Sequence, residues 1–390
     1  MDYERLMSNE IQNIPPSGIR RFFSIAEELD NVVSLGVGEP DFATPWIVRR
    51  AGIESLERGK TWYSANAGLR ELRVQISGYL KRRFDLEYDP DTEMFVSVGG
   101  SEAIDMCMRA ILNPGDEVLL PTPSFVCYDP IAKMCGAKVT CIELREEDEF
   151  RLTADQLRAA ISEKTKLLVL PFPNNPTGAI MDRSDLEAIA EVLKGTDILV
   201  LSDEIYAELT YGGGRHCAPA SLSKDMWDRT ITVNGFSKAF AMTGWRLGYA
   251  CGPAPVITQM LKMHQYAIMC APSTAQYAGI VAVRDCDDIV EEMVEEYDSR
   301  RRYLVREFNR IGLHCFEPKG AFYVFPSIQS TGLSAEDFCE QLVYSKRIAV
   351  VPGSAFGPGG EGHVRVSYSY SLNHLKKAIA GIEAFLKERQ

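Results

Sequence analysis

The chain has 390 residues, of which 46% are hydrophobic and 25% are charged, and its formal net charge at pH 7 is −12. This length allows two or three domains with a large core, and the acidic balance argues against nucleic acid or an anionic membrane as a partner. The sequence has no apolar run of about eighteen residues and no signal-peptide core at its start. We therefore expect a cytoplasmic protein without a membrane span.

The ten cysteines and five histidines are scattered along the chain. There is no C-x-x-C pair, no H-E-x-x-H motif, and no cysteine at ligand spacing from a histidine. We expect free thiols in a reducing compartment, and neither a disulfide framework nor a metal site.

The first 44 residues are expected to form an arm followed by a strand. The apolar run at 32–38 predicts the strand, and Glu39-Pro40 ends it. Local sequence is compatible with Gly38 being an ordinary turn glycine. Further on, Tyr63 lies in a loop before a helix that opens at 68–72, and local sequence gives it no role beyond a loop aromatic.

A strand at 94–98 runs into Gly99-Gly100-Ser101-Glu102, where a helix begins that is predicted to reach about Leu112. Ser101 is expected to be its N-cap. The N-terminus of this helix would offer unpaired N–H groups and positive potential to a phosphate. Turns of this kind are also common without any ligand.

The middle of the chain alternates apolar strands with helical patterns. Strands are predicted at 117–120, 167–170, 198–201 and 230–233, and helices at about 153–162 and 183–194. This alternation predicts a mostly parallel sheet covered on both faces. Asn175, Asp203 and Lys238 all follow strands, at the sheet edge where ligands of such folds bind.

Lys238 and Arg246 lie among small and apolar residues, which argues against a solvated surface for either cation. A desolvated lysine loses its proton readily and becomes a usable nucleophile. The alternative is that Lys238 is an ordinary lysine at a strand edge and Arg246 a structural ion-pair partner.

After about residue 280 the pattern changes. A single amphipathic helix is predicted over 287–311, with an apolar stripe that includes Ile289, Met293 and Tyr297, and Gly312 ends it. We expect this helix to connect a large domain to a smaller C-terminal α/β domain.

Five motifs, spread over most of the chain, give it a clear family resemblance. It resembles the pyridoxal-phosphate (PLP) enzymes of fold type I, specifically the class I aminotransferases of the aspartate and aromatic branch. The motifs are GEPDF at 38–42, NNPTG at 174–178, SDEIY at 202–206, SKAFAMTGWRLGYA at 237–250 and RVSYS at 365–369.

The resemblance implies an α/β fold with two domains and a homodimer whose active sites lie at the interface. The large PLP-binding domain would cover residues 45–280 and contain a mostly parallel seven-stranded sheet flanked by helices. The small α/β domain would cover 281–390, with the arm and first strand of 1–44 packed against it.

The resemblance also assigns roles to individual residues. Lys238 would bond covalently to PLP and then move a proton from the substrate Cα to the cofactor, Asp203 would pair with the pyridine nitrogen, and Asn175 and Tyr206 would hydrogen-bond the 3′-oxygen. Arg365, with Gly38 and Asn175, would bind the substrate α-carboxylate. The other implied cofactor-binding residues are Gly100, Ser101, Glu102, Ser237 and Arg246 near the phosphate, Phe125 on the pyridine face, and Tyr63, which reaches the site of the partner subunit.

The implied reaction moves the α-amino group of an amino acid to a 2-oxo acid, with 2-oxoglutarate as the expected acceptor, through alternating PLP and pyridoxamine phosphate forms. The donor is expected to be aspartate or an aromatic or neutral amino acid. Two alternatives stay open: a PLP-dependent carbon–sulfur β-lyase of the cystathionine type, and a non-enzymatic regulator that kept the fold.

Two features depart from the family pattern. Gly235 stands where a small hydroxylic residue is frequent, which removes one phosphate contact. No second arginine for a dicarboxylate side chain can be identified, and the loop Met269-Cys270-Ala271-Pro272, expected near the substrate pocket of the neighbouring subunit, is apolar.

Overall fold

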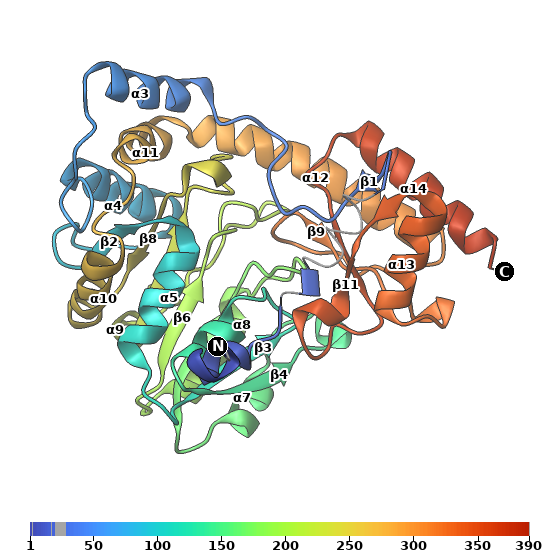
Figure 1. Cartoon of the computed structure of the whole chain (residues 1–390), viewed down its shortest axis with the longest axis horizontal. Helices are drawn as coiled ribbons and strands as arrows, with labels where there is room; N and C mark the ends of the chain where they lie inside the picture. The colour runs from blue at the N-terminus through green and yellow to red at the C-terminus, as the bar shows by residue number, and fades with distance from the viewer. Residues whose placement is uncertain (2, 17, 20–28, 390) are drawn as a thin grey trace.

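The computed structural model describes residues 1, 3–16, 18–19 and 29–389. Its centre is a seven-stranded sheet with the strand order β2-β8-β7-β6-β5-β3-β4 (Figure 1). All neighbours pair in parallel except at β8, which is antiparallel to both β2 and β7. The predicted mostly parallel sheet is therefore confirmed. Its strands are β2 (Met94–Ser97), β3 (Glu117–Thr122), β4 (Lys138–Glu143), β5 (Thr165–Leu170), β6 (Leu199–Asp203), β7 (Thr230–Gly235) and β8 (Gly248–Cys251).

The inner strands carry apolar side chains on both faces because helices cover both faces of the sheet. In β5, Leu167 and Val169 join a buried cluster with α5 and α10, whereas Leu168 and Leu170 join another cluster with α7 and α8. Alternate side chains of a strand point to opposite faces, so a strand buried on both sides is apolar at successive positions and not only at every second one.

The helices of this part begin and end where local sequence signals predict. Thr153 and Asp182 each form a capping box at the start of α7 and α8, close to the predicted starts at 153 and 183. The helices are α3 (Trp46–Glu57), α4 (Arg70–Phe84), α5 (Gly99–Ile111), α6 (Tyr128–Met134), α7 (Ala154–Ala160), α8 (Arg183–Leu193), α9 (Lys224–Arg229), α10 (Ala254–Ala267) and α11 (Ser273–Asp285). Short 3₁₀ turns lie at η2 (Glu146–Asp148), η3 (Pro219–Ser221) and η4 (Thr243–Trp245).

The C-terminal part contains a three-stranded antiparallel sheet, β11-β12-β9, and joins the beginning of the chain through a two-stranded parallel pair, β1-β10. One hydrophobic core contains Leu35, which follows β1, together with Leu304 and Val366. The elements are β1 (Val33–Ser34), α12 (Asp287–Arg310), β9 (Tyr323–Val324), η5 (Gln329–Thr331), α13 (Ala335–Lys346), β10 (Ile348–Ala349), β11 (Val351–Pro352), η6 (Gly353–Phe356), β12 (Val364–Ser367) and α14 (Leu372–Lys387). The predicted boundaries at residues 44 and 280 stay a prediction, which this pairing supports.

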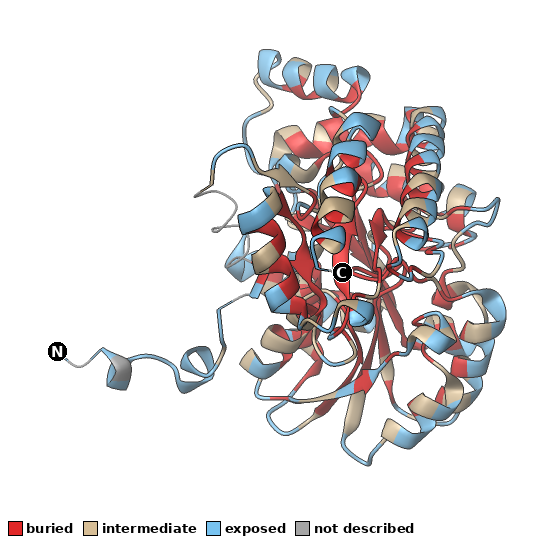
Figure 2. Cartoon of the chain, turned by 90° about the vertical axis from the view of Figure 1, so that its right-hand side faces the viewer, coloured by how far each residue is buried: buried red, intermediate tan, exposed pale blue. Residues whose placement is uncertain are grey.

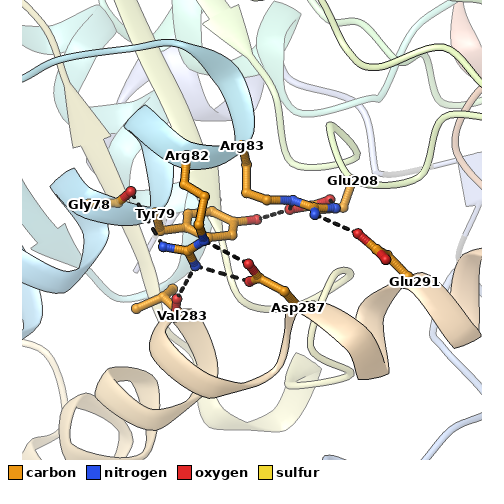
Figure 3. Close-up of polar contacts among 8 residues, drawn as sticks. All are labelled: Gly78, Tyr79, Arg82, Arg83, Glu208, Val283, Asp287 and Glu291. Atoms are coloured by element: carbon orange, nitrogen blue, oxygen red, sulfur yellow. Dashed lines mark hydrogen bonds and ion pairs between the residues drawn. The ribbon is translucent and has the colours of Figure 1, made fainter.

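The connecting helix α12 ends one residue before the predicted Ile311, and its stripe is buried at Met293 and Tyr297. Ile289 is only partly buried because Val290 takes the inward position. A polar cluster ties α12 to α4 (Figure 3). Within it, Arg83 bridges Glu208 and Glu291, with both distances at 2.7 Å.

The beginning of the chain, with η1 (Glu4–Leu6) and α1 (Asn9–Gln12), projects from the body of the molecule and is largely exposed (Figure 2). α1 contacts α6, beside the large sheet. Ile19 is buried against Val351 and Phe356 of the C-terminal part. Among the described residues, no helix is long and apolar enough to cross a membrane.

Two local predictions were wrong. The first strand is only two residues long, because beyond Ser34 the backbone carbonyls of Gly36 and Gly38 bind side chains instead of a neighbouring strand. Ser101 is not an N-cap: α5 already begins at Gly99, and Ser101 lies exposed in its first turn.

Candidate active site

A cavity of about 390 Å³ lies beyond the carboxyl ends of β5, β6 and β7, where segments from both parts of the chain meet. Its walls include every predicted site residue except Glu102 and Tyr63. These residues are Gly38, Gly100, Ser101, Phe125, Asn175, Asp203, Tyr206, Ser237, Lys238, Arg246 and Arg365.

Lys238 follows β7, and its Nζ donates a hydrogen bond of 2.8 Å to the carbonyl oxygen of Gly38. The Nζ also lies 5.7 Å from the ring centroids of both Tyr206 and Phe322. Burial lowers the pKa of Lys238 from 10.5 to about 8, because desolvation disfavours the charged amine. The amine is thus within reach of its neutral, nucleophilic form near neutral pH.

Asp203 is the last residue of β6 and is 7% exposed. Its carboxylate accepts hydrogen bonds from the hydroxyl of Tyr128 at 2.6 Å and from the N–H of Ile205 at 3.1 Å. Burial raises its pKa, against the effect of these donors. A cation placed in the cavity would favour the ionised carboxylate, as the sequence analysis expected of a protonated pyridine.

Tyr128 was missed by the sequence analysis. It opens α6, three residues after Phe125, and its ring stands edge-on to that ring at 6.4 Å between centroids. The available signal was the need of a buried Asp203 for a hydrogen-bond donor, but local sequence does not say which side chain supplies it.

Arg365 lies on β12 and is 3% exposed. Its guanidinium donates to Asn175 Oδ1 at 2.9 Å and to the carbonyl oxygen of Gly36, so both of these hydrogen-bond partners are uncharged. Its Nε is buried and has no partner among the described residues. A buried guanidinium with neutral partners and an unused donor fits an anionic ligand.

A second anion-binding feature is built at the start of α5. Gly99 has a φ of +77°, and a Cβ there would lie 2.7 Å from Nη2 of Arg246. A Cβ on Gly248 would lie 2.7 Å from the backbone N of Gly100. The two glycines therefore let the guanidinium and the first turn of α5 approach one another, as a phosphate site requires.

Arg246 is exposed, contrary to the expectation that it is buried. It follows η4 in a left-handed conformation, with a φ of 53°, and its Nη1 donates to the carbonyl oxygen of Thr243 at 2.9 Å. Of its neighbours, Leu247 and Gly248 are buried, whereas Arg246 itself is exposed and lines the cavity.

Glu102 does not line the cavity. Its carboxylate accepts the N–H of Val98 at 2.5 Å and lies 2.6 Å from Nδ1 of His264, whose side chain is fully buried in α10. Glu102 thus caps α5 from within, in place of the expected Ser101. Its side chain is occupied, and because α5 begins at Gly99 its backbone N–H is the first to bond within the helix, so Glu102 has no free donor for a phosphate.

Two further positions bear on the predicted pattern. A Cβ on Gly235 would lie 3.1 Å from Cα of Gly248 and from the carbonyl oxygen of Leu247, so a hydroxylic residue there would need this backbone to move by a few tenths of an ångström. Tyr63 lies outside this chain's cavity with 78% of its surface exposed.

A cavity at the strand ends that contains a lysine, a buried carboxylate and two arginines is typical of an enzyme active site. Comparison with known proteins identifies the family. The family description "Aminotransferase class I and II" matches residues 30–382. The chain is 44% identical to an aspartate aminotransferase of Pyrococcus abyssi and 41% identical to aromatic-amino-acid aminotransferase 2 of Thermococcus litoralis, in each case over 98% of this chain and 99% of the relative. An aromatic aminotransferase from Pyrococcus horikoshii has the same fold, with a TM-score of 0.90 and 45% identity over 94% of this chain and 99% of that one.

The chain therefore belongs to the class I and II aminotransferases and is a PLP-dependent enzyme of that family. The predicted fold type, family and aminotransferase activity are confirmed. The residues of the site fit the cofactor: a lysine with a lowered pKa, a buried carboxylate, an aromatic wall and a glycine cradle beside an arginine surround one cavity.

Proposed function

We propose that this aminotransferase transfers the α-amino group of an aromatic or neutral amino acid, or of aspartate, to 2-oxoglutarate, with PLP held in the cavity described above. One observation carries the proposal. A single cavity brings together Lys238, whose pKa is about 8, the buried carboxylate of Asp203 and the guanidinium of Arg365, which has no carboxylate partner among the described residues.

The proposed roles follow from the position of each group. PLP, when bound, supplies an electron-accepting pyridine ring. Asp203 would hold a proton on the pyridine nitrogen, and Arg246 with the start of α5 would hold the phosphate. Arg365 would orient the substrate by its α-carboxylate. Lys238 would take the proton from the substrate Cα and return it to the cofactor side.

Two other hydrogen-bonding groups complete the site. Asn175 and Tyr206 would hydrogen-bond the cofactor 3′-oxygen, and Asn175 already meets Arg365, so it connects the cofactor side of the cavity to the substrate side. Ser237 is buried beside Lys238 and would add a hydroxyl for the phosphate. Phe125 would cover one face of the ring.

The cavity supports an aromatic or neutral donor. Among its described lining residues, the cationic ones are Lys238, Arg246 and Arg365, and each already has a role. The remaining wall includes the apolar side chains of Ile19, Val37 and Ile104. Aspartate would need a further cation for its second carboxylate. The names of the two relatives cover both donor classes, so the donor is the quantity to measure.

We also propose a cytoplasmic homodimer in which Tyr63 reaches the partner's cavity. All ten cysteines are free, as expected in a reducing compartment. Trp62 and Tyr63 are 66% and 78% exposed, and the Trp62 carbonyl oxygen accepts a hydrogen bond from Ser273, which joins this loop to the loop of Met269, itself 44% exposed. Exposed apolar residues gathered in this way are typical of an interface.

A charge placed in this patch tests the dimer. Trp62→Glu should lower the molar mass measured by light scattering to that of one chain and remove activity, because Tyr63 would then leave the partner's site. Tyr344→Glu is the matched control, since Tyr344 is 57% exposed on α13, away from the patch. A Trp62→Glu protein that keeps the mass of two chains would contradict the proposed interface.

The reaction itself is tested by the visible spectrum of the purified, PLP-loaded protein while single amino acids are added without an acceptor. An amino donor should convert the band of the lysine-bound cofactor to that of pyridoxamine phosphate, and ranking donors by rate gives the substrate class. Lys238→Ala should hold PLP without the covalent bond and lose at least about a thousandfold in turnover.

Three results would contradict the proposed reaction, the role of Lys238 or the preferred donor. A band that persists while pyruvate and ammonia accumulate from cystathionine would replace the proposal by a carbon–sulfur β-lyase. Near-normal turnover in Lys238→Ala would reject the role of that lysine. Faster conversion by aspartate than by phenylalanine or tyrosine would reject the preference for an aromatic donor.

A further inference from the structure

The hydroxyl groups of Tyr206 and Tyr323 lie 2.9 Å apart inside the cavity, and no sequence motif pointed to Tyr323. Tyr323 is on β9 of the C-terminal sheet, and Tyr206 follows β6 of the central sheet. Both side chains are buried, at 1% and 5% exposure. The contact therefore joins the two sheets at the site itself.

Each phenol has one proton to donate, so only one of the two can be the donor in this hydrogen bond. If Tyr206 donates to Tyr323, its proton is used and it has none for a ligand in the cavity. If Tyr323 donates to Tyr206, the proton of Tyr206 is free to point into the cavity. The direction of this hydrogen bond therefore decides whether Tyr206 can donate a hydrogen bond to a ligand in the cavity.

Arg365 selects the direction. Its guanidinium carbon lies 4.6 Å from the ring centroid of Tyr323. Burial raises the pKa of both phenols, but the nearby guanidinium offsets this rise mainly at Tyr323, whereas the pKa of Tyr206 is raised well above its usual value. A cation placed against the ring of Tyr323 makes its O–H the stronger donor, so the position of Arg365 favours Tyr323 as the donor and Tyr206 as the acceptor.

The backbone of Gly38 leaves room for this arrangement. A Cβ at Gly38 would lie 2.2 Å from the hydroxyl oxygen of Tyr323, so only a glycine allows that hydroxyl to occupy its position. The carbonyl oxygen of the same residue accepts the hydrogen bond from Lys238 at 2.8 Å. The Tyr323 hydroxyl thus lies between Gly38, which also binds the amine of Lys238, and Tyr206.

We propose that Tyr323 is a positioning residue with two separable actions: its hydroxyl holds the proton of Tyr206 towards the cofactor 3′-oxygen, and its ring supports the guanidinium of Arg365 that binds the substrate carboxylate. The inference rests on the proposed function, because it uses the assigned ligands of Tyr206 and Arg365. It adds a residue that connects the cofactor side of the cavity to the substrate side.

The two actions predict different defects. A hydrogen bond donated to the 3′-oxygen stabilises its negative charge and so lowers the basicity of the lysine-bound cofactor. Tyr323→Phe keeps the ring and loses the hydroxyl. It should raise the pH midpoint of the visible band by about half a pH unit or more and leave the KM for amino donors nearly unchanged. Tyr323→Leu should raise the midpoint equally and also raise the KM about tenfold.

A double-mutant cycle with Tyr206→Phe makes the test specific. Tyr206→Phe should raise the midpoint by itself, and the double variant should show no further rise, since Tyr323 acts through Tyr206. The control is Tyr368→Phe: Tyr368 is fully buried nearby and donates to the carbonyl oxygen of Ala321 at 3.1 Å, but does not line the cavity. Its midpoint should equal that of the wild type.

The outcomes separate the two proposals. A wild-type protein that forms no visible band with PLP rejects the proposed function. A wild type with the band, combined with an unmoved midpoint in Tyr323→Phe or fully additive shifts in the double variant, rejects only the role of the Tyr323 hydroxyl. A tenfold KM defect already present in Tyr323→Phe rejects the separation between hydroxyl and ring. The midpoint is read from spectra, so it does not depend on turnover.

Discussion

Two arginines of this molecule, Arg83, which is partly buried, and Arg365, which is buried, have opposite surroundings. Arg83 on α4 contacts both carboxylate oxygens of Glu208, whose Oε1 also accepts the hydroxyl of Tyr79, and a further nitrogen bonds Glu291 (Figure 3). Arg365 is buried more deeply and has only the amide oxygen of Asn175 and a backbone carbonyl as hydrogen-bond partners.

The difference separates an arginine that holds the fold from one that awaits a ligand. In the Arg83 cluster every arginine has a carboxylate partner within the protein. Two of these carboxylates, on Asp287 and Glu291, lie in α12 and so connect the cluster to the C-terminal part. At Arg365 the protein provides burial, two aromatic rings and neutral acceptors, and leaves the negative charge to the substrate. An unpaired buried charge is unfavourable until its partner arrives.

The largest expected effect is the loss of substrate binding in Arg365→Met. The kcat/KM for every amino donor should fall about a thousandfold, because two charge-assisted hydrogen bonds to the carboxylate disappear. The free energy of unfolding without substrate should change by less than about 1 kcal/mol or increase, since no carboxylate loses its partner. Urea unfolding and steady-state kinetics measure the two quantities.

Arg300→Met on α12 is the matched variant, because Arg300 is also buried but is paired with Asp41 at 2.8 Å and with Glu296. Arg300→Met should lower the free energy of unfolding, because it leaves two carboxylates without their partner, whereas Arg365→Met should not lower it. Equal losses of stability in the two variants would show that the neutral partners of Arg365 compensate its charge as well as carboxylates do.

The next effect is on stability alone. Glu208→Gln keeps the side-chain volume but removes the charge that faces Arg83, and should lower the free energy of unfolding by about 3 kcal/mol. Glu291→Gln, whose carboxylate side chain is 58% exposed, should cost less than about 1 kcal/mol. Both variants should keep wild-type kcat/KM once folded. A large kinetic defect in Glu208→Gln would mean that this cluster acts on the site.

The smallest effect is a pH dependence at Lys238, whose amine donates its hydrogen bond to the backbone carbonyl of Gly38 and not to a carboxylate. With a pKa of about 8, the neutral amine increases about tenfold per pH unit below pH 8 and then levels off. The rate at which PLP-free protein forms the visible band should follow this curve. A rate that keeps rising towards pH 10.5 would indicate an ordinary lysine.

The lowered pKa of Lys238 also makes the free energy of unfolding depend on pH. Between about pH 8 and 10.5 the unfolded chain holds a proton on this lysine that the folded protein has released. The contribution of Lys238 to the stability of PLP-free protein therefore rises with pH in this window. Lys238→Met should remove that slope, which urea unfolding at several pH values can measure.

The sequence was sufficient for the parts of the site that belong to continuous motifs. Asn175, Asp203 and Lys238 line one cavity because each follows a strand of the central sheet, and the carboxyl ends of parallel strands meet at one edge. Tyr128 and Tyr323 were missed because their importance arises from pairing with Asp203 and Tyr206, far away in sequence. Such pairs are set by packing between elements.

The remaining errors have a similar origin. Ser101 satisfies the local rule for an N-cap, but the Glu102 carboxylate reaches back to Val98 and takes that function, held in place by His264 from another helix. The apolar neighbours of Arg246 predict a buried side chain, yet it follows a turn with a left-handed backbone, is exposed and lines the cavity. Neither outcome can be deduced from residue types in a short window.

The short β1–β10 pair has a consequence for how the protein is made. Val33 pairs with Ile348, and the carbonyl oxygen of Gly36 meets Arg365, a separation of 329 residues. During synthesis the ribosome must therefore complete almost the whole chain before the carboxylate pocket can close. Contacts between such distant segments are slow to form, so a nascent chain can complete its central sheet well before it can bind an amino acid.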